Sequence, residues 1–349
     1  MRVLVFSERL APPPDEGIKN LALSLAAALR RKGHAVLALT TDGADWPEQQ
    51  VTNQPAGRLL WSRPLAQRIA RFRPQAVCYV PTASLTVASA IRSRVLKHHA
   101  NGAPVALIAT QGRRHSPFAR WVGRLIRPDL CVVQSLTTEM QACALGWRVV
   151  RVLPGVDADA FHPVSPQQRA VLRAQHGIPA DAWVVVHVGH LNRRRGVAAL
   201  AALADLAYPV LVASTSTPQD AALADELRAA GVYLVTAYLP DVREAYQLAD
   251  AYLFPTPPDP TEPGSIDLPL SVLEAAACNL PILATRFGAL PDLWPDRPDV
   301  IFYDDVPGLR AGLMRLKAAH PATRDLALPF SWEAAGQRIL DALPPASRS

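Results

Sequence analysis

Short apolar runs alternate with amphipathic segments along the first half of the chain. The apolar runs are too brief for helices, which predicts buried strands. We expect these strands at Val3–Phe6, Ala35–Leu39, Ala76–Val80, Val105–Ala109, Leu130–Val133 and Val149–Leu153. The segments between them carry apolar residues at helical spacing, which predicts helices at Asn20–Lys32, Leu65–Phe72, Thr86–His98, Phe118–Ile126 and Thr137–Leu145. This alternation is typical of a parallel sheet with helices on both faces.

A second series of the same kind follows an interruption at Pro154-Gly155 and the polar, proline-bearing stretch 162–168. Its expected strands are Trp183–Val188, Val210–Ala213, Val232–Thr236, Ala251–Phe254, Ile282–Ala284 and Val300–Phe302. Its expected helices lie near Val197–Leu206, Asp220–Ala230, Asp241–Ala249, Ser271–Cys278, Pro307–Ala318 and Ser331–Leu343. The sequence therefore predicts an α/β protein of two doubly wound, Rossmann-like domains facing a central cleft, with ligands at the carboxyl ends of the strands.

Length and composition indicate which class of protein and which cellular compartment to expect. The 349 residues suffice for two domains, and no apolar run is long enough for a transmembrane helix. The chain opens on the strand-like Arg2–Phe6, so we expect no secretory signal. The four cysteines form no C-x-x-C pair, which favours reduced thiols in a cytoplasmic protein and argues against a zinc site.

Charge is distributed unevenly between the two halves. Residues 1–150 hold 20 Lys and Arg against 8 Asp and Glu, a net charge of +12, whereas residues 151–349 hold 16 against 22, a net charge of −6. A basic half of this kind attracts anionic lipid, nucleic acid or a phosphorylated substrate. Arginine outnumbers lysine 32 to 4, so a solvated basic face in an arginine-rich protein is the competing interpretation.

The stretch Leu268–Pro291 carries the most informative chemistry. It reads as a loop, a helix that ends before Pro281, and a buried strand. The helix start near Ser271 offers backbone N–H groups that can hold an anion, and Glu274 lies one turn inside the helix. Amides for a phosphate and a carboxylate for ribose hydroxyls together suit a nucleotide.

A second candidate motif is the run His187–Gly196. A buried strand ends at Gly189 and a helix follows Gly196, with Arg193, Arg194 and Arg195 in the turn between them. Guanidinium groups chelate phosphate oxygens, and nearby amides add donors, so this turn suits a diphosphate. The alternative is a solvated basic turn.

These motifs resemble the family 4 glycosyltransferases of the GT-B fold. The resemblance also rests on Pro154-Gly155-Val156-Asp157, Phe161-His162-Pro163 and the closing Phe330-Ser331-Trp332-Glu333. It covers most of the chain and is strongest from about residue 130 to 292. It implies an acceptor-side domain at residues 1–158, a nucleotide-sugar-binding domain at 159–328 and a last helix at 329–349 that packs back on the first domain.

The resemblance also implies roles for residues of the second domain. Arg195, with Arg194 and Gly189 beside it, matches the turn that holds the donor diphosphate, and His190 stands where the family usually has an arginine or another polar group. Glu274 matches the second glutamate of the E-x7-E motif, which binds ribose hydroxyls. The segment whose amides approach the phosphates corresponds to Leu270, Ser271 and Val272.

The first glutamate of that motif, which faces the donor sugar in the family, is absent. Ile266 stands in its place, and Asp267 or Glu262 could substitute from the same loop. The alternative is that neither carboxylate touches the sugar. We count Asp267 with Arg195 and Glu274 as the candidate catalytic residues.

The first domain matches the family less closely. Gly17 precedes the first helix and could let the backbone approach a phosphate or acceptor. Gln111 stands where many members carry a histidine, and His115 follows four residues on, facing either the cleft or solvent. Asp157-Ala-Asp159 formally reads D-x-D but falls on the family's G-V-D segment, so we expect no metal.

The resemblance implies a retaining glycosyltransferase of the hexosyltransferase class. It would move a sugar from a nucleoside-diphosphate sugar to an acceptor hydroxyl, lipid-linked or on a polysaccharide, without a cofactor and without nucleic acid. A cytoplasmic location follows, and the basic half adds a peripheral position on the inner face of the membrane. Two alternatives stay open, a nucleotide-sugar epimerase or hydrolase of the same fold and a non-catalytic nucleotide-sugar-binding protein. A nicotinamide enzyme is disfavoured because no G-x-G-x-x-G follows a strand.

Overall fold

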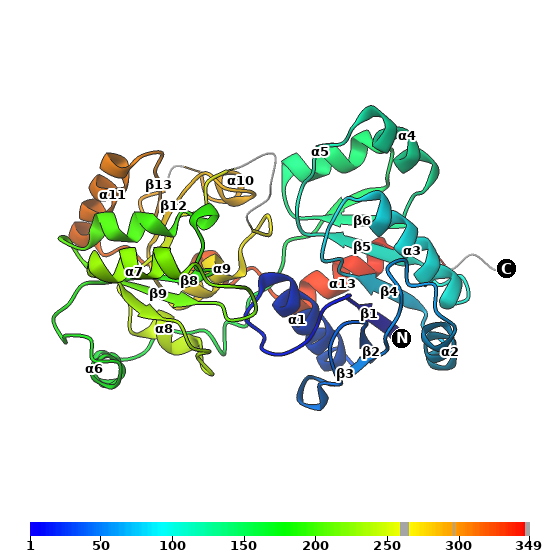
Figure 1. The fold of residues 1–349 in the computed structure, drawn as a ribbon, viewed down its shortest axis with the longest axis horizontal. Coiled ribbons are helices and arrows are strands. Elements are labelled where there is room, and N and C mark those ends of the chain that lie inside the picture. The colour runs from blue at the N-terminus through cyan, green and yellow to red at the C-terminus, as the bar shows by residue number, and fades with distance from the viewer. Residues whose placement is uncertain (259–264, 296, 346–349) are drawn as a thin grey trace. The chain divides into compact units, whose positions relative to one another are not determined.

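The computed structural model describes residues 1–258, 265–295 and 297–345 (Figure 1). They form two compact units, the first made of Met1–Gly155, Pro260–Leu268 and Ser331–Ser349, and the second of Val156–Asp259 and Pro269–Phe330. The described residues 265–268 thus group with the first unit although they lie between two elements of the second in sequence. Glu262, one of the two carboxylates considered for the donor sugar, lies outside the described residues.

The first unit is built on a seven-stranded parallel sheet in the order β3-β2-β1-β4-β5-β6-β7. Its strands are β1 (Arg2–Phe6), β2 (Ala35–Thr40), β3 (Val51–Asn53), β4 (Ala76–Tyr79), β5 (Val105–Ala109), β6 (Leu130–Val133) and β7 (Val149–Arg151). The predicted strands are confirmed, and β3 was missed because this short edge strand, V-T-N, carries no apolar run. The strand order reverses direction between β1 and β4, which is where ligands bind in doubly wound sheets.

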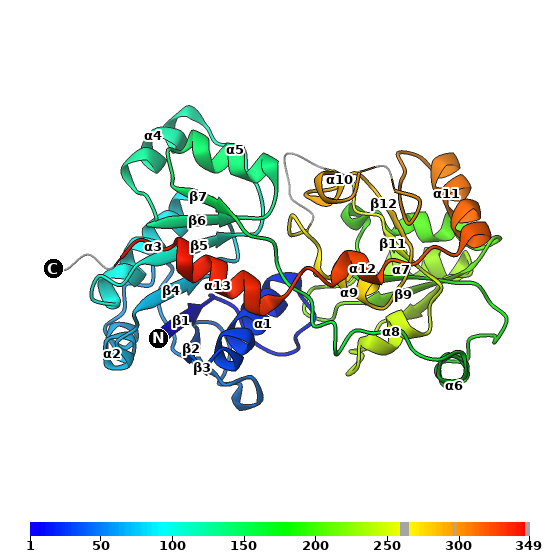
Figure 2. The same ribbon diagram turned by 180° about the vertical axis from the view of Figure 1, so that it is seen from behind.

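The described part of the first unit holds six α-helices and the short 3-10 helix η1 (Pro47–Gln49). The α-helices are α1 (Gly17–Arg31), α2 (Arg63–Phe72), α3 (Val87–His99), α4 (Pro117–Leu125), α5 (Leu136–Ala144) and α13 (Trp332–Ala342). Figure 2 shows α13 lying beside α1 from the opposite end of the chain. Buried apolar residues of β1, β4 and β5 pack with those of α2 and α3, which explains why these strands read as continuous apolar runs.

The second unit holds a six-stranded parallel sheet in the order β10-β9-β8-β11-β12-β13. Its strands are β8 (Val184–Gly189), β9 (Tyr208–Ala213), β10 (Tyr233–Val235), β11 (Ala251–Phe254), β12 (Ile282–Ala284) and β13 (Val300–Phe302). Its α-helices are α6 (Pro166–Gln175), α7 (Ala221–Ala229), α8 (Arg243–Gln247), α9 (Leu270–Ala277), α10 (Leu290–Leu293), α11 (Val306–Ala319) and α12 (Arg324–Ala327).

Two local predictions in the second unit were wrong. The polar stretch 162–168 was read as a break, yet α6 begins inside it, because Ser165 caps the helix, Gln168 completes the capping box and Pro166 occupies the first turn. The expected helix near Val197–Leu206 is instead a 3-10 helix, η3 (Val197–Leu203). The doubly wound α/β class is confirmed in both units, and no described helix is long and apolar enough to cross a membrane.

Candidate functional site

The turn after β8 is held by a buried histidine. His187 Nδ1 lies 2.9 Å from the carbonyl oxygen of Leu253 on β11, and its Nε2 has no hydrogen-bond partner. Burial lowers the pKa of His187 to about 4, so the ring is neutral at physiological pH. A Cβ on Gly189 would lie 2.7 Å from that Nε2, so the position requires glycine.

The arginines beyond this turn lie on a short 3-10 helix, η2 (Arg193–Arg195), with different surroundings. Asn192 caps it by accepting the backbone N–H of Arg195 at 3.1 Å. Arg193 is held by ion pairs with Glu226 and Asp220. Burial raises the pKa of Tyr252 and lowers that of His187, and the positive charge of Arg195 acts to lower both values, which places this guanidinium near both side chains.

His190, the other polar residue predicted for this turn, faces the loop after β9. Its Nδ1 lies 2.6 Å from Thr217 Oγ1. A histidine held in this way has a fixed ring orientation, but the contact gives no sign of a phosphate. Its role in donor binding stays a prediction, as does that of Arg194, which is exposed on η2.

The helix α9 presents the predicted nucleotide-binding side chains on one face. Tyr252, the second residue of β11, donates its hydroxyl to Ser271 Oγ at 2.8 Å, and Tyr246 of α8 donates to Glu274 Oε2 at 2.7 Å. Burial raises the pKa of Glu274 to about 7. The two tyrosines themselves contact each other, with ring centroids 5.9 Å apart, so they join both contacts into one cluster.

Leu270 and Val272 contribute no polar side chain to this cluster. Both are buried, so any contact with a phosphate runs through their backbone N–H groups at the start of α9. Pro269 precedes the helix and provides no side-chain cap. The structure therefore brings Gly189, Arg195, Ser271 and Glu274 together at the carboxyl ends of β8 and β11, in an arrangement that suits a nucleoside diphosphate.

Asp267 has a different environment, within the first unit. Its Oδ2 accepts hydrogen bonds from the hydroxyls of Ser135, at 2.7 Å, and Thr138 at the start of α5. Its backbone N–H donates to the carbonyl oxygen of Thr110 at 2.7 Å. Burial raises the pKa of Asp267, while hydrogen bonds from Thr138, Ser135 and the Gly112 amide act in the opposite direction. These contacts anchor the residue, and its catalytic role stays a prediction.

Gly17 and Gln111 both lie close to the segment that contains Ile266 and Asp267. A Cβ on Gly17 would come within 3.2 Å of Ile266 Cδ1, so the glycine makes room for Ile266 at the start of α1. Gln111 is half-buried between Thr110 and Gly112, which both contact Asp267. His115 is half-buried a few residues on. Its Nε2 has no partner, and burial together with Arg113 and Arg120 lowers its pKa.

A carboxylate that the sequence reasoning missed lies at the other side of the first sheet. Glu8 follows β1 and accepts hydrogen bonds from Tyr79, from the amide of Thr82 at 3.0 Å and from Arg92 at 2.7 Å. It lines a cavity of about 400 Å³. The other lining residues include Arg9, Thr41, Asp42, Arg58 and Thr82. A charged residue two positions after the last residue of a buried strand is the signal that would have identified it.

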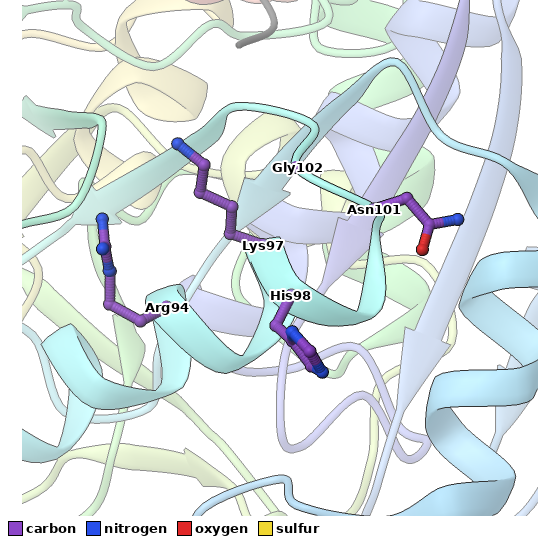
Figure 3. A pocket seen from close by; sticks show the side chains of 5 residues that line it. All are labelled: Arg94, Lys97, His98, Asn101 and Gly102. Atoms are coloured by element: carbon purple, nitrogen blue, oxygen red, sulfur yellow. The ribbon is translucent and has the colours of Figure 1, made fainter. Parts of the chain in front are cut away.

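A second cavity of the first unit, of about 540 Å³, is basic but poorly suited to an anion (Figure 3). It is lined by Arg94, Lys97, His98, Asn101 and Gly102 at the end of α3. Lys97 is neutralised by Asp129 at 2.6 Å. Cations at this position complement the negative end of the helix dipole, which accounts for them without a ligand. Within the described parts of the chain, no group of three or more His, Cys, Asp and Glu side chains could hold a metal ion.

Residues 182–317 match the family model described as Glycosyl transferases group 1. The α-maltose-1-phosphate synthase of Mycolicibacterium smegmatis is 28% identical over 186 residues, which cover 49% of this chain and 46% of that protein. The D-inositol 3-phosphate glycosyltransferase of Saccharomonospora viridis is 33% identical over 159 residues, covering 40% and 35%. The chain spans about half the length of the first curated relatives it matches.

The fold extends the likeness to the whole chain. The crystal structure of Anabaena HepE in complex with UDP-glucose superposes with a TM-score of 0.73 at 18% identity and covers 98% of this chain and 99% of that one. At this identity the match shows a common fold. Both units therefore have the architecture of GT-B glycosyltransferases.

Proposed function

Because residues 182–317 match the family model of the glycosyl transferases group 1, we propose that the protein transfers a sugar from a nucleoside-diphosphate sugar to an acceptor hydroxyl. The observation that carries the proposal is the cluster of Arg195, Ser271 and Glu274 at the ends of β8 and β11. The cluster lies inside the residues that match the family model. Glu274 accepts the ribose hydroxyls, and the start of α9 with Arg195 receives the diphosphate.

The chemistry requires the bond between the sugar and the diphosphate to break. The electron pair of that bond stays on the leaving phosphate, where Arg195 and the amides of Leu270, Ser271 and Val272 stabilise the developing negative charge. The acceptor oxygen attacks the same face of the sugar and passes its proton to the leaving phosphate. Anomeric configuration is then retained, and no protein nucleophile or metal ion takes part.

HepE was crystallised with UDP and with UDP-glucose, which makes these the first ligands to test on this chain. A uridine nucleotide and a hexose are therefore our proposal for the donor. Since Ile266 replaces the glutamate that the family resemblance places opposite the sugar, contacts to the sugar hydroxyls must come from other residues.

Asp267 is reassigned in this proposal from a catalytic to a positioning residue. Its carboxylate accepts hydrogen bonds from Ser135 and Thr138, so it fixes the segment that enters α9 instead of contacting the sugar. The acceptor hydroxyl is assigned to the first unit, with two candidate surfaces. One is the loop with Gln111 and His115, and the other is the cavity beside Glu8, whose carboxylate and guanidinium groups suit a polyhydroxyl compound.

The two alternatives of the same fold are less well supported. Both curated relatives described above are named for synthesis or transfer, which favours a transferase over an epimerase, a hydrolase or a binding protein. We place the protein in the cytoplasm, where its basic first unit binds peripherally to the inner face of the membrane.

Calorimetric titration with UDP and UDP-glucose tests the donor site. Arg195→Ala and Glu274→Ala should each weaken UDP binding about tenfold or more, because a hydrogen bond to a charged group contributes roughly 1.5–3 kcal/mol. Arg193→Ala is the matched control, since Glu226 and Asp220 already hold that arginine. Turnover of the donor only when an acceptor is present would distinguish transfer from hydrolysis. Equal UDP affinity in all three variants and the parent protein would refute the site.

A further inference from the structure

The helix α4 exposes its apolar side chains instead of burying them. Phe118, Trp121 and Leu125 are 72%, 58% and 66% exposed, and they follow one another at the spacing of a single helical stripe. The helix α2 of the same unit, also amphipathic and basic, buries Leu65 and Ile69 instead. The apolar face of α4 is therefore available to something outside the unit.

The packing of α4 against the rest of the unit explains why this stripe points outward. Gly123 is the buried residue of the helix, and a Cβ there would lie 2.9 Å from Leu145 Cδ2. The indole of Trp147 donates to the carbonyl oxygen of Gly123 at 2.9 Å. At about 100° per residue, Trp121 and Leu125 lie on the opposite side of the helix from Gly123. The packing fixes α4 with its apolar stripe away from the core.

The next helix extends the exposed apolar surface. Leu136 and Met140, one turn apart at the start of α5, are both exposed. We call the exposed apolar residues of the two helices, Phe118, Trp121, Leu125, Leu136 and Met140, the α4–α5 face. Exposed apolar side chains gathered on neighbouring helices, unlike singly scattered ones, mark an interaction site.

Arginines surround this face. Arg113, Arg114, Arg120, Arg124 and Arg127 are all exposed. Over the described parts of the chain, none of the five forms a salt bridge. No carboxylate in the described parts of the chain therefore neutralises their charge, in contrast to Arg92, which pairs with Glu8.

We propose that the α4–α5 face docks the protein on an anionic phospholipid bilayer. A helix with Phe, Trp and Leu on one side and arginines beside them lies in the plane of a membrane surface, with its apolar side chains among the lipid headgroups and acyl chains. The arginines complement the negative surface potential, and this charge selects an anionic bilayer over a neutral one. Tryptophan favours this interface because one edge is apolar and the N–H is polar.

Docking on this face would define the class of acceptor. The loop from Gln111 to Ser116 leads directly from β5 into α4, so a bilayer on α4 lies next to the end of β5. An amphiphilic acceptor could then present its hydroxyl there while its acyl chains stay in the bilayer. This step rests on the proposed function, whereas the docking itself does not.

Co-sedimentation with vesicles tests the docking without donor or acceptor. The protein should bind vesicles of phosphatidylglycerol and phosphatidylcholine at low salt, and much less of it should bind phosphatidylcholine alone. Trp121→Ser should weaken binding about tenfold. The pair Arg120→Glu and Arg124→Glu should weaken it more and remove the preference for anionic lipid. Trp61→Ser is the matched control, because Trp61 is 69% exposed in the same unit but lies outside the face.

Several results would overturn the proposal. Equal binding to both kinds of vesicle, or an unchanged affinity in Trp121→Ser, would exclude docking through this face. A dimer in solution that Trp121→Ser converts to a monomer would assign the face to a second copy of the chain. UDP affinity measured on the same variants separates the two proposals. Docking can fail while the donor site still binds UDP, and UDP binding can fail while the protein still binds vesicles.

Discussion

Burial of Glu274 in the proposed donor site lowers the stability of the folded protein at neutral pH, and this effect can be measured. The side chain is half-buried, and burial raises its pKa from 4.5 to about 7. Between these two pH values the folded state holds a proton on Glu274 that the unfolded state has lost. Stability from this group is therefore present at low pH and falls as pH rises through the window from 4.5 to about 7.

The substitution Glu274→Gln removes this titration with little change of shape. A glutamine oxygen can still accept the hydroxyl of Tyr246, which lies 2.7 Å from the carboxylate. The full pKa difference corresponds to about 3 kcal/mol, and partial exposure of the side chain lowers the expected gain to about 1–3 kcal/mol at pH 8. At pH 4.5 the gain should be small, because the carboxyl is then protonated in the folded protein.

Urea unfolding of the parent protein and Glu274→Gln at the two pH values measures the difference directly. The variant should be more stable at pH 8 and nearly equal at pH 4.5, while UDP binds it more weakly at pH 8. Glu226→Gln, on the exposed surface of α7, is the control for a change of net charge. A stability difference that is the same at both pH values would refute the argument that Glu274 titrates in a buried site.

Three further predictions follow from the same contacts. Arg195→Ala should keep the unfolding temperature of the parent protein while losing about 1.5–3 kcal/mol of UDP binding, measured by differential scanning and titration calorimetry on one preparation. Asp267→Ala should destabilise the first unit by about 1–3 kcal/mol, because Ser135 and Thr138 lose their acceptor, and an unchanged urea midpoint would contradict the anchoring role. Transfer should continue in EDTA, and activity that disappears in the chelator and returns with magnesium or manganese would refute the metal-free mechanism.

The strands were predictable because their burial on both faces requires continuous apolar runs. The helix α9 was also predictable, because its apolar residues follow helical spacing and Pro281 marks where it must have ended. The edge strand β3 has no such run. In α6 the capping box was present in the sequence, but the prolines and polar residues around it were read as a break.

The environment of Asp267 could not be read from the sequence. Its acceptor contacts with Thr138 and Ser135 join residues 129 and 132 positions apart, and no local pattern encodes such a pairing. Sequence reasoning placed Asp267 by analogy with a missing glutamate, whereas its contacts depend on how the segment before α9 folds onto the first unit. Glu274 was accessible to reasoning because its helix and the adjacent strand are local and strongly patterned.

The excess of arginine in the first half had two explanations, amino-acid bias and function, and the structure separates them by position. Some basic residues hold the unit together, as Arg92 does with Glu8 and Lys97 with Asp129. Others complement a helix end, as around α3. Arg124 lies in the last turn of α4, and Arg127 donates to the carbonyl oxygen of Arg124 at 2.6 Å, so these two also complement a helix end. Arg113, Arg114 and Arg120 do neither, and they lie on or just before the helix whose apolar side chains folding has left exposed. Bias alone would spread arginines over any solvated surface, but it does not account for exposed Phe118, Trp121 and Leu125 among them. An anionic bilayer accounts for both at once, because it offers negative charge to the arginines and an apolar interior to the aromatic side chains.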